Sequence, residues 1–161
     1  MKDPAITLRP ATETDLNEMR ELYRGTITTV CANDYDEAQR AVWASTADNA
    51  ERWANLIREQ HVLLAISDGK IAGFSSLRDG DYLDFMYVHK DCQRMGVAET
   101  LLKAIEQKAL EMGCTVITSD VSKTARPFFE RKGYTVLAEQ VNQRQGVELI
   151  NYKMKKDLKN N

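Results

Sequence analysis

Apolar residues near the start of the chain recur with the spacing of an amphipathic helix. Steps of three and four residues separate Leu16, Met19 and Tyr23. Just before them, Thr12 and Asp15 have the spacing of a capping box, in which two residues bond each other's backbone N–H groups. A short strand is expected over residues 6–9, where apolar and polar side chains alternate.

A second helical pattern begins after Ser45. Its apolar face consists of Ala50, Trp53, Ala54 and Ile57. Residues 28–43, between the two helices, have no sustained period, and Asp34 is expected to cap a short helix within them. Irregular connections often carry binding residues. Three large or hydroxyl-bearing side chains of this connection are therefore candidate substrate contacts: Thr28, Tyr35 and Trp43.

Three strands are predicted next, in an antiparallel meander. The pair Asp-Gly at 68–69, between the runs 62–66 and 70–77, is a strong signal for a tight hairpin, because both positions of such a turn need a positive φ. A second turn at 79–81 leads into a third run, 82–88.

The longest helical pattern begins at about Arg94 and ends before Gly113. Its apolar face is formed by Ala98, Leu101, Leu102, Ile105, Ala109 and Met112. A strand rich in β-branched residues follows over 115–119. A strand, a helix and a second strand in this order form a right-handed crossover with parallel strands.

The rest of the chain adds a short helix and two strands. Thr124 is expected to cap the helix, since Pro127 is tolerated only in a first turn. Strands are expected over 134–138 and 148–154. The prediction is thus a single domain over residues 1–161 with an α+β fold. Its sheet is mixed and mostly antiparallel, with the parallel crossover in the middle, and a groove opens where the parallel strands splay apart.

The composition is that of a globular protein that needs neither disulfides nor a metal to fold, with 161 residues, 43% of them hydrophobic and 29% charged. The net charge of −2 is spread over both signs, so no basic stripe is available for a nucleic acid. No apolar run has the length of a membrane span, and the start of the chain lacks the apolar segment of a secretion signal. We therefore expect a cytoplasmic protein without a membrane partner. The three cysteines lack metal-ligand spacing, which argues against a zinc site.

The turn between the strand 82–88 and the longest helix carries the most specific chemistry. A helix that begins directly after a turn presents unpaired N–H groups and the positive end of its dipole. Both suit a phosphate or a diphosphate. Gly96 allows an anion to approach the backbone closely, and Ala98 keeps the next turn small. The sequence therefore predicts a phosphorylated cofactor beside this strand.

These residues resemble the acetyl-CoA signature of the GNAT superfamily of N-acetyltransferases, Q/R-x-x-G-x-G/A. The matching residues are Gln93, Arg94, Met95, Gly96, Val97 and Ala98. The family's second pattern is an Ala, two aromatic residues, and then a Gly with an aromatic residue. Its matches are Ala125, Phe128, Phe129, Gly133 and Tyr134. The order of elements also fits, so the resemblance covers nearly the whole chain.

The resemblance implies that an acetyl group passes from acetyl-CoA directly to a primary amine of a small molecule or a protein while both are bound. The backbone of Met86, Tyr87 and Val88 would pair with the pantetheine arm, and the signature amides would hold the diphosphate. A backbone N–H near Tyr87 or Val88 would stabilise the oxyanion. Further cofactor contacts would come from Ser122, Ala125, Phe128 and Phe129. Arg131 either reaches the 3′-phosphate or is solvated at the surface.

Two catalytic roles are left open. The second aromatic residue of the family's pattern is commonly a Tyr that protonates the departing thiolate, but this chain has Phe129. The candidates for the acid are Tyr134, Tyr87, Tyr152 and a water molecule. The candidate base is Asp84, because it shares a strand face with Val88; Asp34 and Glu139 are remoter candidates.

The expected function is that of an acetyl-CoA-dependent N-acetyltransferase, whose partners are acetyl-CoA and an amine acceptor. A homodimer is compatible with the resemblance, since relatives often pair through strands near the C-terminus. Phe129 cannot protonate the departing thiolate, and this favours one alternative function. The alternative is an acyl-CoA-binding sensor or interaction module without turnover.

Overall fold

The computed structural model describes residues 5–158 of the chain. Residues 1–4, on which part of the expectation about a secretion signal rests, lie outside this range. No helix within 5–158 combines the length and the hydropathy that a membrane span requires.

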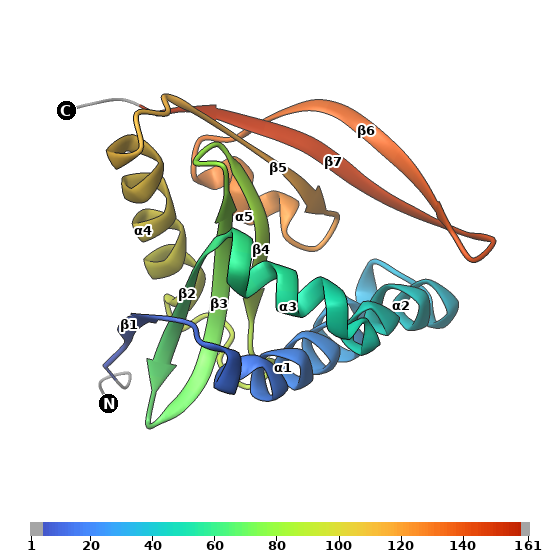
Figure 1. The fold of residues 1–161 in the computed structure, drawn as a ribbon. Coiled ribbons are helices and arrows are strands. Elements are labelled where there is room, and N and C mark those ends of the chain that lie inside the picture. The colour runs from blue at the N-terminus through green and yellow to red at the C-terminus, as the bar shows by residue number, and fades with distance from the viewer. Residues whose placement is uncertain (1–4, 159–161) are drawn as a thin grey trace.

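The described residues form one seven-stranded sheet and five α-helices (Figure 1). The strands are β1 (Thr7–Pro10), β2 (His61–Ser67), β3 (Lys70–Arg78), β4 (Tyr82–Val88), β5 (Val116–Ser122), β6 (Thr135–Arg144) and β7 (Val147–Asp157). The helices are α1 (Leu16–Thr29), α2 (Glu37–Ala44), α3 (Ala50–Glu59), α4 (Val97–Glu111) and α5 (Arg126–Arg131). Short 3-10 helices are η1 (Glu13–Asp15), η2 (Val30–Asn33) and η3 (Ser45–Asp48).

Helices cover both faces of the sheet (Figure 1). On one face α1 and α3 pack against β2, β3 and β4, and Met19, Trp53 and Phe74 are fully buried there. On the other face α4 and α5 pack against β3, β4, β5 and β7, around the buried Ile105 and Ile117. The apolar faces predicted for α1, α3 and α4 hold the three layers together in large part. Ala50 and Met112 are exposed, however, and Leu56, which was not predicted, is fully buried on α3.

The strand order is β1-β2-β3-β4-β5-β7-β6, and every neighbouring pair is antiparallel except β4 and β5. The predicted α+β fold, with a mixed sheet and one parallel crossover through α4, is confirmed. β4 and β5 pair only at Tyr82 with Thr118 and at Leu83 with Ser119. Beyond these positions the two strands diverge, which opens the splayed groove that the pattern of elements predicts.

Two predicted helix caps are wrong for one shared reason. The Oδ2 atom of Asp34 accepts a hydrogen bond from the Oγ1 hydroxyl of Thr124 at 2.7 Å, so neither side chain caps a helix. Asp36 caps α2 instead, where its Oδ1 accepts from the backbone N–H of Gln39 at 2.8 Å. The pairing of Asp34 with Thr124 ties the α1–α2 connection to the β5–α5 loop across the mouth of the groove.

The β6–β7 hairpin is longer than predicted. Its tip is a two-residue turn in which Gln145 and Gly146 both have a positive φ, 50° and 76°. Figure 1 shows the hairpin reaching over to α2. Gln39 of α2 donates from Nε2 to the carbonyl oxygen of Glu148 at 2.9 Å. The Tyr35 hydroxyl donates to the carbonyl oxygen of Ile150 at 2.5 Å. The hairpin therefore closes one side of the groove.

Asp15 fixes the chain where it enters α1. Its carboxylate accepts two hydrogen bonds from the guanidinium of Arg9, both at 2.9 Å, and one from the backbone N–H of Thr12 at 2.8 Å. The bond from Arg9 is the main cause that lowers the pKa of Asp15 to about 2. Because the folded protein binds this proton more weakly than the unfolded chain, the carboxylate stabilises the fold above its ordinary pKa, and that stabilisation is lost as the pH falls towards 2.

We predict that Asp15→Asn lowers the free energy of unfolding at pH 7 by about 0.5–2 kcal/mol, because the capping bond and the ion pair are both weakened. The difference in the free energy of unfolding between the variant and the unaltered protein should shrink as the pH approaches 2. Urea unfolding at several pH values measures it. Glu13→Gln, which removes a charge in the same turn, is the control. A difference that stays constant with pH would contradict the prediction.

Candidate acyl-CoA and acceptor site

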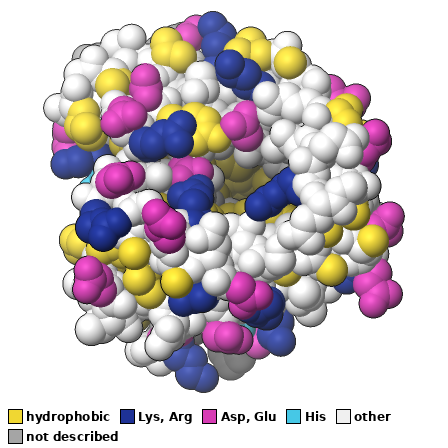
Figure 2. Space-filling model, turned by 45° about the vertical axis from the view of Figure 1, so that its right-hand side comes forward, with side chains coloured by type: hydrophobic (Ala, Val, Ile, Leu, Met, Phe, Trp, Pro, Cys, Tyr) yellow, Lys and Arg dark blue, Asp and Glu magenta, His cyan; other side chains and the backbone are white. Residues whose placement is uncertain are grey.

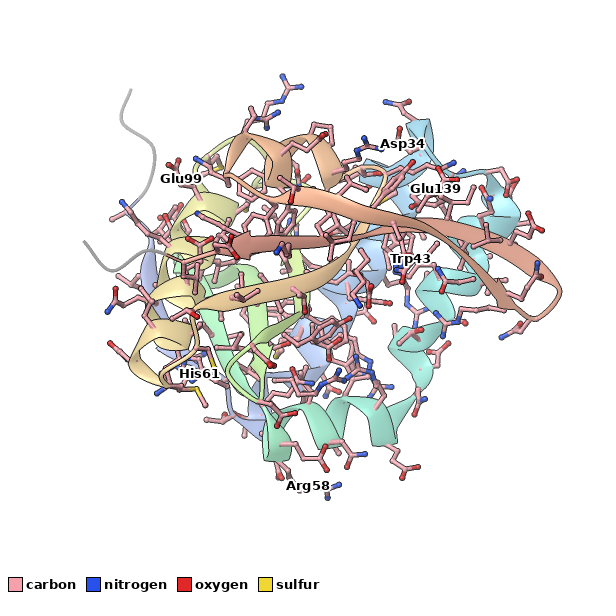
Figure 3. All side chains as sticks on the ribbon, turned by 90° about the horizontal axis from the view of Figure 1, so that it is seen from above. Asp34, Trp43, Arg58, His61, Glu99 and Glu139 are labelled. Carbon is pink, nitrogen blue, oxygen red and sulfur yellow. The ribbon has the colours of Figure 1, made fainter. Side chains whose placement is uncertain are left out.

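The diverging strands β4 and β5 open into a cavity of about 1070 Å³. Its walls come from both faces of the sheet, with α1, η2 and α2 on one side and α4, α5 and the turn before α4 on the other. Figure 2 shows the hollow, with hydrophobic side chains at its bottom. Glu99 and Trp43 both line it and lie far apart in Figure 3, so the cavity is long and suits an extended ligand.

A bulge in β4 bends the strand that lines this cavity. Ser75 pairs with Met86 and Leu77 with Leu83, so that Ser76 faces two residues of β4. The hydroxyl of Ser76 accepts from the N–H of Phe85 at 3.1 Å, and that of Ser75 donates to the carbonyl of Phe85 at 2.7 Å. Both serines are fully buried. Their hydroxyl bonds replace the backbone hydrogen bonds between β3 and β4 that the bulge interrupts, and they hold the bend in one conformation.

Beyond the bulge, alternate backbone groups of β4 face the cavity. The N–H of His89 donates to the carbonyl of Ala72 at 2.8 Å and so points towards β3. Because successive backbone groups on a strand point to opposite edges, the N–H groups of Val88 and Met86 point into the gap. The N–H of Tyr87, the other expected oxyanion donor, points towards β3 instead. The carbonyl of Val88 already accepts from Thr26 Oγ1 at 2.7 Å and from Gln93 Nε2 at 2.8 Å. The end of β4 is thereby fixed, with two donors left for a ligand.

The first turn of α4 presents unpaired backbone amides. Gly96, the residue just before the helix, has φ +83°, and the first helical bond runs from the N–H of Thr100 to the carbonyl of Gly96 at 3.0 Å. The N–H groups of Val97, Ala98 and Glu99 therefore have no helical partner, and no side chain among residues 5–158 caps the helix. Nothing in the described structure lies within 4 Å of a Cβ built on Gly96. This helix end is open, as an anion site requires.

α4 begins at Val97, three residues later than predicted. Arg94 is in the left-handed region, with φ +62°, so the residues before Val97 form a turn and not the first turn of the helix. This turn brings the signature residues to the cavity, which is lined by Gln93, Arg94, Gly96, Val97 and Ala98. Met95 is not among its lining residues, because its side chain packs with the apolar cluster under α4.

The second motif forms the opposite wall. The structure places all of its predicted cofactor residues along the cavity, together with those of β4: Met86, Tyr87, Val88, Ser122, Ala125, Phe128, Phe129 and Arg131. The hydroxyl of Ser122 accepts from the N–H of Ala125 at 3.1 Å and begins the turn into α5. The rings of Phe128 and Phe129 meet edge to face, 5.5 Å apart. Nearby, Lys132 pairs with Glu99 at 2.9 Å.

Aromatic side chains form the other end of the cavity. Tyr35 and Trp43 line it and meet edge to face at 5.2 Å, and Leu149 of β7 packs beside them. The indole N–H of Trp43 donates to the Tyr87 hydroxyl at 3.2 Å. The Tyr35 hydroxyl accepts from the N–H of Lys123 at 2.9 Å, and burial raises the pKa of Tyr35 to about 12. These hydroxyls are committed to structural bonds, so this wall of the cavity is apolar.

One candidate substrate residue lies elsewhere. Thr28 is exposed on α1, and its hydroxyl donates to the carbonyl of Arg24 at 2.9 Å in the preceding turn. It is absent from the cavity lining among the described residues. Thr28 belongs to the last turn of α1, and its carbonyl accepts from Arg40 Nη1 at 2.7 Å, which joins α1 to α2.

Asp84 lines the cavity at the bulge, and its side chain is only 10% exposed. It does not share a strand face with Val88 as predicted, because the bulge breaks the alternation: Asp84 meets Arg52 of α3, whereas Val88 packs with the cluster under α4. Its Oδ2 atom accepts from Arg52 Nη2 at 2.8 Å and from Gln60 Nε2 at 2.7 Å. Its Oδ1 atom accepts no hydrogen bond from residues 5–158 and is available to a ligand. The remoter candidates for the base, Asp34 and Glu139, are not among the lining residues.

The hydroxyl of Tyr134 is directed away from the cavity. It donates to Glu106 Oε2 on α4 at 2.8 Å, and Lys156 pairs with the same carboxylate at 3.0 Å. Burial and the negative charge of Glu106 raise the pKa of Tyr134. Neither Tyr134 nor Tyr152 lines the cavity within residues 5–158. Of the three tyrosines considered as the acid, only Tyr87 does, and its hydroxyl accepts from Trp43.

Sequence reasoning missed several cavity residues, among them Thr26, Asp120 and Arg144. Asp120 Oδ2 accepts from the hydroxyl of Tyr82 at 2.5 Å, and its Oδ1 accepts from Gln140 at 2.8 Å. These residues come from a helix interior, a strand end and a hairpin tip. No local motif marks them, because only the folded sheet brings them to the cavity.

Comparisons with known proteins agree with this geometry. The family model for the acetyltransferase (GNAT) domain matches residues 31–156. A crystal structure from Rhodopseudomonas palustris, described as a GCN5-related N-acetyltransferase and as an aminotransferase of class II, is 34% identical, with a TM-score of 0.92 and 98% of each chain covered. The uncharacterized N-acetyltransferase YafP of Escherichia coli (strain K12) is 29% identical over 150 residues, which are 93% of this chain and 95% of YafP.

A more distant structure shares the fold. The PaiA N-acetyltransferase of Thermoplasma acidophilum, solved in complex with coenzyme A, is 20% identical, with a TM-score of 0.78. The alignment covers 95% of this chain and 99% of that one.

We predict that Gly96→Asp weakens the binding of coenzyme A by a factor on the order of 100 or more, because a carboxylate would occupy the space in front of the unpaired amides. Titration calorimetry measures the affinity. Gly96→Asn is the matched control, since Asn has the same shape without the charge and tolerates a positive φ. If the Asp variant binds as tightly as the unaltered protein, the ligand's phosphates lie elsewhere.

Proposed function

This chain belongs to the GNAT family of acetyltransferases, and from that premise we propose that it transfers an acetyl group from acetyl-CoA to a primary amine of a small molecule or a protein. Acetyl-CoA is the cosubstrate, because the chain belongs to this family. The PaiA structure, which shares the fold, was solved with coenzyme A bound. The observation that carries the proposal is the open N-terminus of α4, which faces the gap between β4 and β5. The amine attacks the thioester directly while both substrates are bound. The cytoplasmic location and a homodimer stay predictions.

The backbone of this chain holds the cosubstrate. The amides at the start of α4 bind the diphosphate, and the inward N–H groups of Met86 and Val88 bond the pantetheine arm as an added strand would. Arg131 lines the cavity and has no ion-pair partner among the described residues, so it is available to the 3′-phosphate. These contacts place the thioester beside the bulge in β4.

The N–H group of Val88 or Met86 stabilises the oxyanion that forms when the amine attacks. A fixed backbone donor needs no reorganisation during the reaction, and one such donor contributes about 2.7–4 kcal/mol. The bonds from Thr26 and Gln93 to the Val88 carbonyl keep this part of the strand in place.

Asp84 takes the proton from the amine. Its Oδ2 is held by Arg52 and Gln60, so the carboxylate keeps one orientation, while its Oδ1 is free to accept from an ammonium group directly or through a water molecule. The departing thiolate meets Phe129, which has no proton to give. A water molecule in the cavity supplies that proton.

A direct test of the function is an assay for free thiol with acetyl-CoA and a panel of primary amines. Thiol release that depends on an amine, with the acetylated amine found by mass spectrometry, supports the proposal. Tight binding of acetyl-CoA with no release across a broad panel would instead favour the binding module without turnover.

We predict that Asp84→Asn lowers kcat by about 10²–10⁴-fold, because the proton acceptor is lost. Arg52→Gln is the matched control, since it breaks the same ion pair but leaves the carboxylate in place. The control should keep most of the activity, and both variants should lose a similar amount of thermal stability. Equal losses of kcat in the two variants would mean that the ion pair is only structural.

We predict that Tyr134→Phe leaves kcat within about twofold, because the hydroxyl contacts Glu106 and not the cavity. The same change should lower the free energy of unfolding by about 1.5–3 kcal/mol, the usual contribution of a hydrogen bond to a charged group. Turnover and urea unfolding are measured on the same samples. A fall in kcat of about 10²-fold or more would restore Tyr134 as the acid.

A further inference from the structure

The acceptor end of the cavity joins an apolar wall to a few charged groups. Tyr35, Trp43 and Tyr87 form the wall, and Leu149 packs against it. Asp84 provides an anionic oxygen at the bulge. An amine that fits this end therefore needs an apolar part next to its ammonium group.

Arg144, the last residue of β6, also lines the cavity. Its Nη2 donates to Oγ1 of Thr46 in η3 at 3.0 Å, so the guanidinium reaches from the hairpin tip to the helices on the other side. The hairpin itself is fixed by the bonds of Tyr35 and Gln39 to the carbonyls of Ile150 and Glu148. The position of the guanidinium is therefore defined by the fold.

This guanidinium has no counter-ion in the described part of the protein. Within residues 5–158, no carboxylate oxygen lies within ion-pair distance of Arg144. Of its five N–H donors, the structure commits one, to the neutral hydroxyl of Thr46. The other cationic residues that line the cavity lie at the opposite end, on the turn before α4 and on and after α5: Arg94, Arg131 and Lys132.

We infer that Arg144 binds a carboxylate of the acceptor, so that the preferred substrates are amino acids with an apolar side chain. The inference rests on the proposed function and names the substrate class of the same site. Asp84 binds the ammonium group, the aromatic wall covers the side chain, and the remaining N–H groups of Arg144 pair with both carboxylate oxygens, a geometry that guanidinium groups favour.

The test compares L-amino acids that have apolar side chains with their primary amides, in which a neutral group replaces the carboxylate. We expect kcat/KM for acetylation to be about 10- to 100-fold higher for the acids, the usual effect of a hydrogen-bonded charge pair. The amides have the more easily deprotonated amine, so such a preference cannot come from the amine. Equal or better acetylation of the amides overturns the inference but leaves the acetyltransferase activity established.

Three variants separate recognition from a structural bridge. Arg144→Gln should remove the preference for the acids, and Arg144→Lys should keep part of it, since the charge remains. Thr46→Ala removes the bond across the cavity and leaves the guanidinium, so the preference should survive. A preference unchanged in Arg144→Gln, or lost equally in Thr46→Ala, would show that Arg144 only braces the hairpin.

A binding measurement judges the inference independently of turnover. N-acetyl amino acids and their amides are titrated into the protein loaded with coenzyme A, by calorimetry. Tighter binding of the acids, lost in Arg144→Gln, supports the carboxylate site even if no amine is acetylated, in which case only the proposed function fails. Binding of neither kind, or equal binding of both, overturns the carboxylate site.

Discussion

The short pairing between β4 and β5 is the constraint on which the site depends. These parallel strands pair only at Tyr82 with Thr118 and at Leu83 with Ser119. Past this point the backbone of β4 has lost its neighbour on one side, and inward N–H groups stay unpaired in the absence of a ligand. Unpaired backbone donors are costly when they are buried. The long cavity keeps them accessible, and an extended ligand can satisfy them.

The rest of the fold keeps that gap open. The buried hydroxyls of Ser75 and Ser76 hold the bulge of β4, and the open start of α4 faces the same space. On the far side, Asp34 with Thr124 and Tyr35 with Ile150 join segments that are distant in sequence. Polar bonds thus bridge the mouth where the hydrophobic layers cannot, because a continuous apolar core would fill the groove.

The periodicity of the chain was sufficient to predict the architecture. The apolar faces of α1, α3 and α4 and the Asp-Gly turn at 68–69 depend on local spacing, and local spacing is visible in a sequence. The caps assigned to Asp34 and Thr124 were wrong because these residues, 90 positions apart, bond each other. A side chain with a distant partner carries no sign of it in its own neighbourhood.

The two ends of the cavity differ in the same way: one depends on local motifs and the other on contacts between residues distant in sequence. The proposed cosubstrate end is formed by two compact motifs, and most of its lining residues could be named from the sequence. The acceptor end was predicted only in part: Tyr35 and Trp43 line it, Thr28 does not, and Arg144 was missed. Arg144 meets Thr46 across 98 residues of sequence. The acceptor specificity that we propose therefore depends on tertiary contacts between segments that have no shared motif.

The most direct test of the central claim is a titration of ¹⁵N-labelled protein with acetyl-CoA, followed through the backbone amide signals. We expect the largest changes at Val97, Ala98 and Glu99, which begin α4, and at the inward amides of Met86 and Val88. Binding that leaves these five signals in place while others shift would contradict the account, since the ligand would then lie outside the gap between β4 and β5.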